Sequence, residues 1–263
     1  MPTNNFSSLS ESELVIICAG LFADEKEKKQ YYLSDSSGRN VQSLKNYSLI
    51  VELCRQVEFY ASTATFVIVT NQVDIITQRA RDILTSKKVY GLGCYLDTIR
   101  FKKIFSEITG LALNEFDATI LGFHNKDMFI SETEFYISKD VSDLYRKKSI
   151  ALQKTILRGK EISDMQKDCN YPEINSGSSK LPAAALYNII EAFTQKFKRL
   201  QLPLNRKLLR CEANGYAQMP CLISYRKIEA VSTILTENDQ ESLNRGISNL
   251  QSEIDELNMI YRQ

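Results

Sequence analysis

The sequence has a single histidine, no C-x-x-C pair and no long apolar run. A membrane-spanning helix needs roughly 18 apolar residues, whereas Leu14–Ala19 and Phe66–Val69, the longest candidates, have the length of buried strands. The six cysteines show no metal-ligand spacing with the one histidine, so we expect no metal. The polar start MPTNNFSSLSESE lacks the order of a signal peptide. We therefore expect free, mostly buried thiols and a cytoplasmic location.

An excess of charge of either sign is also missing. Lys and Arg number 33 against 32 Asp and Glu, which gives a formal net charge of +1. With 43% hydrophobic and 25% charged residues, the composition is typical of a globular protein. This balance predicts no nucleic-acid partner and no membrane partner. A length of 263 residues allows one large domain or two smaller ones.

Strand-like and helix-like segments alternate in the first half of the chain. The order is a strand at Glu13–Gly20, a charged loop or lid at Leu21–Gly38, a helix at Arg39–Tyr60, a strand at Thr65–Thr70, a helix from Asp74, a short strand and turn at Val89–Cys94 and a helix at Tyr95–Thr109. Such alternation predicts a parallel α/β sheet.

The second half has a different pattern. It begins with a strand at Thr119–Phe123, an extended stretch at Met128–Ser138 and a helix at Val141–Lys160. A turn at Asn175–Lys180 and a helix from Pro182 to about Leu200 follow, and then an antiparallel meander of Lys207–Ala213, Gln218–Ser224 and Ile228–Thr236. The last element is a helix at Glu237–Tyr261 that begins with a capping box at Thr236. We therefore predict two domains, residues 1–112 and 113–263, the second of α+β type.

Three side chains could together transfer a proton and bind a carboxylate. His124 follows the apolar strand DATILGFH, at the carboxyl end where α/β proteins place their sites. Asp97 and Arg100 stand three residues apart on one helix face, so the carboxylate could orient the imidazole while the guanidinium clamps a substrate carboxylate. A plainer interpretation stays open, because a lone histidine is more often a packed residue and such an Asp–Arg pair is more often a surface ion pair.

Two further residues lie at suitable junctions. Arg39 stands where the charged loop meets a helix, a place from which a closing loop could deliver a positive donor. Asn71 ends a buried strand and could hydrogen-bond a ligand over the sheet edge. Loop arginines are usually solvated, however, and an asparagine at a strand end usually makes a turn.

The segment VTNQVDIITQRARDILTSKKVYGLGCYLDTIRF resembles the lactate/malate dehydrogenase family, which reads S/T-N-P-x-D-x-x-T and then G-x-G-C-x-L-D-S/T-x-R-F-R. LVIICAG, ILGFH and MPCLIS resemble the family's V-V-I-T-A-G, V-L-G-E-H and V-P-C-I-L-G. The resemblance runs from about Leu14 to the final helix. It implies an α/β fold, a truncated Rossmann-type parallel sheet followed by the family's α+β C-terminal domain.

The resemblance also implies roles for individual residues. For catalysis, His124 matches the residue that donates and accepts the proton, Asp97 its carboxylate partner, and Arg39 the catalytic arginine of the mobile loop. For substrate binding, Arg100 matches the arginine that grips the substrate carboxylate, and Asn71 and Ser179 are further contacts. Ala19, Gly20 and Asn71 match cofactor-binding positions. The implied cofactor is NAD, and the implied substrate is a small 2-oxo or 2-hydroxy acid, pyruvate or lactate by the closer likeness to the lactate type.

The departures from the family pattern concern the scaffold. The chain contains no G-x-G-x-x-G, and its first strand corresponds to the family's fourth. Gln72, Asn125 and Lys126 replace the family's Pro, Gly and Asp, and Ser224–Lys227 replaces G-x-N-G. We therefore expect weak NAD binding and weak or no activity of the isolated chain.

Two alternatives to an active dehydrogenase stay open. One is a pseudoenzyme that acts as a structural or interaction subunit, and the other is a fragment of a normal enzyme. In each case we expect a homo-oligomer, or a partner protein that covers the truncated sheet.

Overall fold

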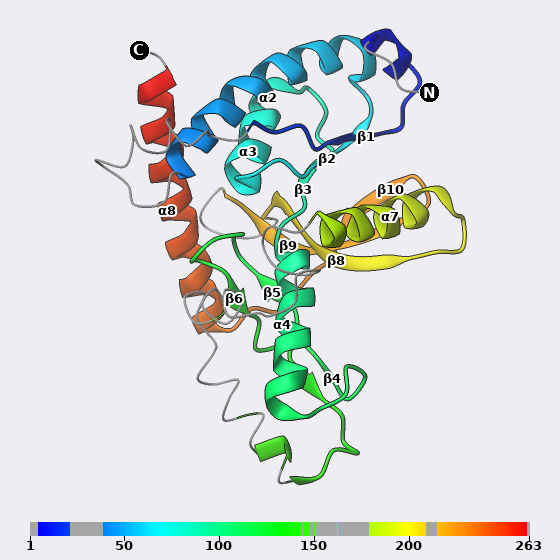
Figure 1. Ribbon diagram of the computed structural model, residues 1–263, viewed down its shortest axis with the longest axis vertical. Coiled ribbons are helices and arrows are strands. Elements are labelled where there is room, and N and C mark those ends of the chain that lie inside the picture. The colour runs from blue at the N-terminus through cyan, green and yellow to red at the C-terminus, as the bar shows by residue number, and fades with distance from the viewer. Residues whose placement is uncertain are drawn as a thin grey trace. The chain divides into compact units, whose positions relative to one another are not determined.

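The computed structural model describes residues 5–21, 39–143, 145–147, 150, 162, 179–208 and 215–261 (Figure 1). The chain forms two compact units. The first comprises Met1–Gly91 together with Asn249–Gln263, and the second comprises Leu92–Ser248. The division between residues 112 and 113, inferred from the sequence for the functional domains, stays a prediction.

The first unit is built on three parallel strands. They are β1 (Leu14–Ile17), β2 (Thr65–Ile68) and β3 (Val89–Gly91). Leu14 pairs with Thr65 in register, and Phe66 pairs with Val89. All four residues of β2 are buried, as the β-branched and aromatic run TFVI predicts for a central strand. The parallel strands predicted in this region are thereby confirmed.

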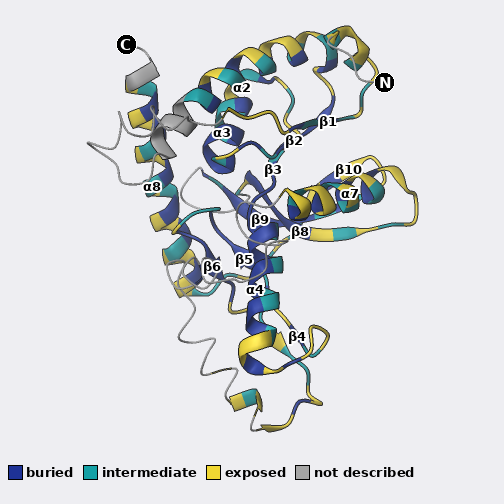
Figure 2. Ribbon diagram, in the orientation of Figure 1, coloured by how far each residue is buried: buried dark blue, intermediate teal, exposed yellow. Residues whose placement is uncertain are grey.

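Two helices and a short 3-10 turn accompany these strands. The turn η1 covers Phe6–Leu9, and the helices are α2 (Arg39–Ala61) and α3 (Val73–Ile83). Helix α3 is mostly buried in its first half (Figure 2) and carries Asp74 in its first turn, where the helix dipole favours a negative charge. It contacts β2 and β3 on one side and α2 on the other. The predicted loop at Leu21–Gly38 lies outside the described residues apart from Leu21.

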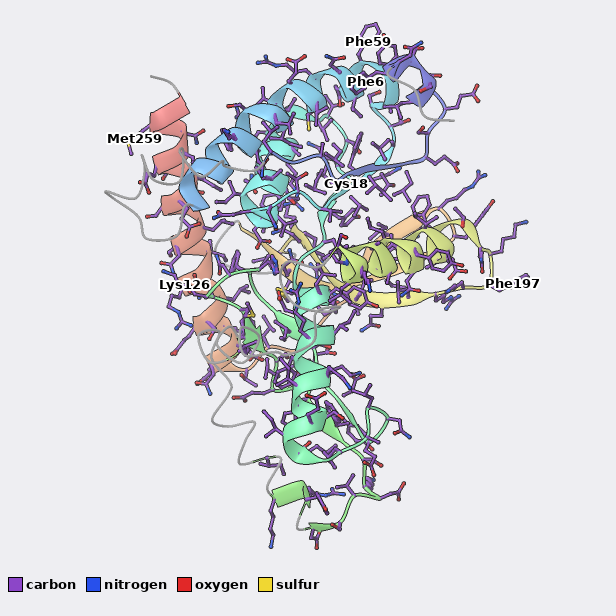
Figure 3. All side chains as sticks on the ribbon, viewed as in Figure 1. Phe6, Cys18, Phe59, Lys126, Phe197 and Met259 are labelled. Atoms are coloured by element: carbon purple, nitrogen blue, oxygen red, sulfur yellow. The ribbon has the colours of Figure 1, made fainter. Side chains whose placement is uncertain are left out.

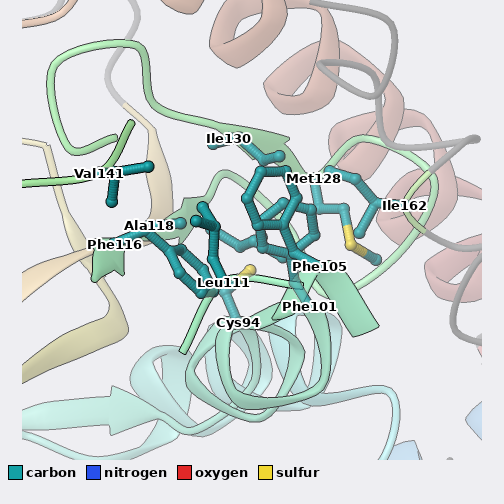
Figure 4. Packing of buried hydrophobic residues seen from close by; sticks show 11 residues of the cluster. Cys94, Phe101, Phe105, Leu111, Phe116, Ala118, Met128, Ile130, Val141 and Ile162 are labelled. Carbon is teal, nitrogen blue, oxygen red and sulfur yellow. The ribbon is translucent and has the colours of Figure 1, made fainter. Parts of the chain in front are cut away.

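The second unit begins with α4 (Cys94–Thr109), which ends at Gly110 in the left-handed conformation with φ 78°. Its apolar face forms a core with the segments that follow it (Figure 4). The buried members are Cys94, Phe101, Phe105, Leu111, Phe116, Ala118, Ile120, Met128, Ile130, Val141 and Ile162. The Phe105 ring packs between two others: its centroid lies 5.4 Å from that of Phe101 and 5.0 Å from that of Phe116.

Four two-residue strands follow α4. Strands β4 (Phe116–Asp117) and β7 (Tyr136–Ile137) form one antiparallel pair, and β5 (Ile120–Leu121) and β6 (Phe129–Ile130) form another. The predicted strand before the histidine is present in shortened form. The helix predicted at Val141–Lys160 lies largely outside the described residues.

The meander is antiparallel as predicted, but two of its strands have other limits. Helix α7 (Lys180–Thr194) is followed by β8 (Leu200–Lys207), β9 (Tyr216–Ser224) and β10 (Lys227–Ala230). The predicted helix to Leu200 was therefore too long, because α7 ends at Thr194, and the strand β8 before Lys207 was not predicted. Residues 209–213 of the strand predicted at Lys207–Ala213 lie outside the described residues. The third strand also ends at Ala230, not at Thr236.

The physical reason lies in the burial of β8. Its residues from Leu202 to Arg206 are buried on both faces, so the strand shows no polar–apolar alternation. Pro203 pairs in register with Pro220 of β9, where its fixed φ suits a strand better than a helix interior.

Helix α8 (Glu237–Tyr261) closes the chain. The hydroxyl of Thr236 accepts a hydrogen bond from the backbone N–H of Asp239 at 3.2 Å, and the Asp239 carboxylate accepts one from the N–H of Thr236 at 3.3 Å. This reciprocal pair confirms the predicted capping box. Within the ranges described, no helix is long and apolar enough to cross a membrane.

Candidate active site

The carboxylate of Asp97 joins the two other predicted site residues of the second unit. Its Oδ2 lies 2.5 Å from Nδ1 of His124, and its Oδ1 accepts a hydrogen bond from Nη1 of Arg100 at 3.2 Å. Asp97 is fully buried, and Arg100 is 4% exposed. The predicted convergence of these three side chains is confirmed, although their roles in a reaction are not tested by this geometry.

Helix α4 positions the acid and the arginine. The spacing of three residues places Asp97 and Arg100 on one face, and Asp97 lies in the first helical turn. The positive end of the helix dipole stabilises a carboxylate there. A buried charge is tolerated when it is paired and hydrogen-bonded, and Asp97 meets this condition through both of its oxygens.

The segment before His124 depends on a glycine. Gly122 has φ 94°, and a Cβ at this position would lie 2.8 Å from the backbone oxygen of Asp127. Only a residue without a side chain fits this close turn. The imidazole that follows is 24% exposed, so it is accessible to a small ligand. Because a carboxylate accepts hydrogen bonds, Nδ1 carries the proton of the neutral ring and Nε2 becomes the nitrogen that can exchange a proton.

Two buried polar residues tie the histidine segment to α4. Gln218 of β9 exchanges backbone hydrogen bonds with Gly122 at 2.7 and 3.1 Å, and its Oε1 accepts from the N–H of Cys94 at 3.4 Å. The hydroxyl of Thr98 accepts from the N–H of Ile120 at 3.0 Å. Sequence reasoning missed both residues. A glutamine inside an apolar strand was the signal that could have indicated one of them.

Helix α8 contributes a second close contact. A Cβ at Gly246 would lie 2.4 Å from two ring carbons of Phe123, the residue before the histidine. Phe123 is fully buried. The ring therefore packs directly against the helix backbone, which a glycine alone allows.

The predicted cofactor-binding residues gather in the first unit. The hydroxyl of Thr70 donates to the backbone oxygen of Ala19 at 2.6 Å. The side chain of Asn46 accepts from the N–H of Leu21 at 2.7 Å and donates to the oxygen of Asn71 at 2.5 Å. Ala19, Gly20 and Asn71 are exposed at the carboxyl ends of β1 and β2, while Asn46 is buried. Asn46, which organises this group, was not among the predicted site residues.

The remaining two predicted residues are less fully placed. Arg39 is the first residue of α2, and its side chain lies outside the described residues. Ser179 is exposed at the N-terminal end of α7, and its side chain makes no capping hydrogen bond to that helix. Both assignments therefore stay predictions.

Cysteine and metal chemistry have little support in the part of the chain that the structure describes. Cys18 is exposed, whereas Cys54, Cys94 and Cys221 are buried, and all four are free thiols. Burial raises the pKa of the Cys54 thiol to about 12, with Glu58 adding to the effect, so this thiol stays protonated at neutral pH. No group of three His, Cys, Asp or Glu side chains in these ranges is arranged to hold a metal ion.

Known proteins with similar sequences are malate dehydrogenases. The chain is 24% identical to the malate dehydrogenase of Methanosarcina acetivorans over 94% of this chain and 80% of that protein. It is 26% identical to the malate dehydrogenase of Chlorobium limicola over 92% of this chain and 75% of that protein. The chain is a relative of the lactate and malate dehydrogenases. No protein-family model matches it.

Solved structures show that the dehydrogenase fold extends over nearly the whole chain. The lactate dehydrogenase from Cryptosporidium parvum, complexed with lactic acid and nicotinamide adenine dinucleotide, matches with a TM-score of 0.73 at 19% identity, over 97% of this chain and 79% of that one. The malate dehydrogenase from Plasmodium falciparum in complex with NADH matches with a TM-score of 0.71 at 16% identity, over 98% and 80%. The predicted fold class is thereby confirmed.

Proposed function

We propose that the chain is an NAD-dependent oxidoreductase that interconverts a small 2-hydroxy acid and its 2-oxo acid. The observation that carries this proposal is the buried Asp97 carboxylate, which binds His124 through one oxygen and Arg100 through the other. A proton carrier and a carboxylate clamp are thus held by the same group. The reaction needs both of these groups from the protein, in addition to the cofactor that carries the hydride.

His124 moves the proton. In the oxidising direction its Nε2 takes the hydroxyl proton of the 2-hydroxy acid, and in the reducing direction it returns that proton to the carbonyl oxygen. The Asp97 carboxylate stabilises the imidazolium formed in the first case and holds the ring in one orientation throughout. The partial exposure of the imidazole permits this exchange with a bound ligand.

Arg100 binds the substrate. A guanidinium has five N–H donors in a planar fork, and a carboxylate ligand can take two of them side by side. The ion pair with Asp97 fixes the side chain, whose burial strengthens its interaction with a ligand's negative charge. The two-point grip orients the reacting carbon.

The residues of the first unit fit one part of a nicotinamide dinucleotide. A Cβ at Gly20 would meet Asn46 and Thr70 only at ordinary distances of 3.7 to 3.9 Å, so packing does not require this glycine. Close approach of a ligand to the exposed strand end is a reason for it. When bound, the cofactor supplies or accepts the hydride. Asn71, Ala19 and Gly20 would hold it at this edge.

The substrate is a 2-oxo acid of three or four carbons. Motifs resembling the lactate type favour pyruvate, whereas the related sequences reported above are named malate dehydrogenases, which favours oxaloacetate. Both acids present the carboxylate that Arg100 would clamp and the carbonyl that His124 would protonate. Activity assays therefore include both.

A non-catalytic role is the second candidate, and it rests on one sequence observation. Gln72, Asn125 and Lys126 stand where the family pattern has Pro, Gly and Asp, beside the proposed contact residue Asn71 and the proposed proton carrier His124.

One experiment separates the two candidates. NADH is titrated by fluorescence, and turnover of pyruvate and of oxaloacetate is measured for the wild type and for His124→Asn and Asp97→Asn. An active enzyme should bind NADH at micromolar concentrations and lose about 10²–10⁴-fold in kcat with either substitution. Asp117→Asn, an exposed carboxylate of the same unit, is the control and should leave kcat unchanged. Absent NADH binding, or turnover that survives His124→Asn, would contradict the enzymatic proposal.

A further inference from the structure

Two neighbouring loops of the second unit concentrate positive charge and aromatic rings. The loop between α7 and β8 reads QKFKR (Gln195–Arg199), and the β9–β10 turn with the strand residue on each side of it reads SYRK (Ser224–Lys227). We call these two segments together the basic tip. Its cations and rings are Lys196, Phe197, Lys198, Arg199, Tyr225, Arg226 and Lys227. Glu191 offsets part of this charge through its contact with Lys198, as Glu229 does through Lys227.

Hydrogen bonding and cation–π contacts join the two loops into one surface. The backbone N–H of Arg226 donates to the oxygen of Phe193, at the end of α7, at 2.7 Å. The Lys196 ammonium lies 5.9 Å from the centroid of the Tyr225 ring, and the Arg226 guanidinium lies 5.1 Å from it. Both distances are within the range of cation–π attraction. The tip is therefore a defined structure that carries cations from both segments.

Phe197 is a fully exposed aromatic residue of the tip. Its side chain is 100% exposed, and Figure 3 shows it at the outer end of the loop, pointing away from the ribbon. Phe193, four residues earlier, is 2% exposed. A single exposed apolar residue is ordinary on a protein surface. This one, however, stands between two lysines at the end of a projecting loop, so cations surround the apolar ring.

Arg226 holds a backbone conformation that its side chain disfavours. Its φ is 55°, which is uncommon for a residue other than Gly, Asn or Asp. The corresponding turn of the family that the sequence resembles reads G-x-N-G, where this conformation is easy. A cation therefore occupies a position at which a smaller residue would be less strained. Such strain at a surface site favours a role for the charge.

We propose that the basic tip docks on an anionic phospholipid surface. The Phe197 ring enters the boundary between headgroups and acyl chains, while the lysines and arginines pair with lipid phosphates and keep their aliphatic stems along the interface. The near-zero net charge of the chain hides this local concentration of cations. The proposal goes beyond the dehydrogenase activity and does not depend on it.

A nucleic-acid strand fits the tip less well. Single strands bind in basic grooves where successive bases stack on several aromatic rings. Here the Tyr225 ring is already engaged by two cations, which leaves Phe197 as one stacking surface at a convex loop end. A convex apolar point flanked by cations suits insertion into a bilayer interface.

The absence of tryptophan from the chain provides a direct probe. Phe197→Trp places one indole at the tip, and its emission should shift to the blue with vesicles of equimolar phosphatidylserine and phosphatidylcholine but not with phosphatidylcholine alone. Phe59→Trp is the matched control, because Phe59 is 81% exposed on α2 next to Glu58. Its emission should not change with either vesicle.

Charge variants test the electrostatic part by co-sedimentation with the same vesicles. Lys196→Gln with Arg226→Gln should lower the partition coefficient about 30-fold, because each cation near an anionic membrane contributes about fivefold. Lys87→Gln with Lys88→Gln, an exposed pair on the first unit, should leave it unchanged. Urea unfolding midpoints check that the variants are folded.

Three outcomes would overturn the proposal. The first is no blue shift of the Phe197→Trp indole with anionic vesicles. The second is vesicle binding that the Lys196 and Arg226 substitutions leave intact. The third is binding to polyuridylate without binding to vesicles, which would assign the tip to nucleic acid. None of these measurements involves NADH, so their failure is distinguishable from failure of the proposed dehydrogenase activity.

Discussion

Gln218 is the residue whose influence on the candidate site is least visible from its position in the sequence. It lies in β9, far along the chain from His124 and Asp97, yet it bonds both to Gly122 and to the first residue of α4. Because α4 carries Asp97 and the Gly122 segment carries His124, Gln218 links the two, through its side-chain amide to Cys94 and through its backbone to Gly122. We therefore regard it as a positioning residue.

Removing this amide should disturb the imidazole without unfolding the protein. Gln218→Met keeps the length of the side chain but loses the acceptor for the Cys94 N–H, so the His124–Asp97 contact should loosen. The one histidine gives a single imidazole Cε1–H resonance in the NMR spectrum. Its chemical shift and the pH at which it titrates should both change.

The matched control is Gln201→Met, an exposed glutamine on the neighbouring strand β8. It should leave the resonance and its titration as in the wild type. An identical His124 titration in Gln218→Met and in the wild type would show that the Gln218 amide has no positioning role. Where turnover is measurable, the effect should be on kcat more than on KM.

At this scale the sequence reveals residues that act through short motifs. Asp97 and Arg100 share one helical turn, and the family motif that ILGFH resembles assigns His124 to the same site, so the proximity of the three could be predicted. Gln218 and Asn46 act through hydrogen bonds across the fold to backbone groups. No local spacing encodes such partners, and they become visible only when the chain is folded.

At the scale of elements, the start of α8 is the feature most open to a quantitative test. Thr236 and Asp239 satisfy each other's backbone N–H groups, which otherwise would lack partners at a helix start. Thr236→Ala should lower the free energy of unfolding by about 1 kcal/mol. Urea denaturation followed by circular dichroism measures this.

Ser252→Ala, an exposed position inside the same helix, is the comparison for that measurement. It removes a hydroxyl without removing a cap, so the free energy of unfolding should change little. Equal effects of the two substitutions would mean that the capping box does not stabilise the helix. Intact stability in Thr236→Ala would lead to the same conclusion.

Elements with a clear period or an unbroken β-branched run were predictable, whereas strand β8 was not. The spacing of apolar residues in α3 predicts a helix, and the β-branched run of β2 predicts a strand. Strand β8 buries consecutive residues, including polar Asn205 and Arg206, so its sequence resembles neither an amphipathic helix nor a half-exposed strand. Its identity comes from pairing with β9, which is a property of the tertiary fold.

At the scale of the whole molecule, we predict that the chain self-associates through the outer face of α4. A cavity of about 640 Å³ opens on this face, lined on the helix side by Tyr95, Ile99 and Lys103 and closed by Leu113 and Pro203 among others. Leu113 is 51% exposed. Covering such an apolar hollow by association is favourable.

Sedimentation velocity at tens of micromolar protein tests this prediction. The wild type should sediment as a dimer or larger species, and Ile99→Asp should shift it towards the monomer because an acid would be buried at the contact. Ile190→Asp, at an exposed isoleucine of α7, should not. A wild type that sediments as a stable monomer would contradict the prediction.

The contact between Gly246 and Phe123 has a further consequence for how the candidate site could diverge. An alanine at 246 would press on the ring beside the proton-exchanging imidazole, since the two would otherwise come within 2.4 Å. Side-chain volume on the last helix is thus coupled to the position of the histidine, although that helix supplies neither His124 nor Asp97 nor Arg100. A larger residue at 246, alone or together with a smaller residue at 123, would therefore move the imidazole and change proton transfer. The charges of His124, Asp97 and Arg100 would all be retained.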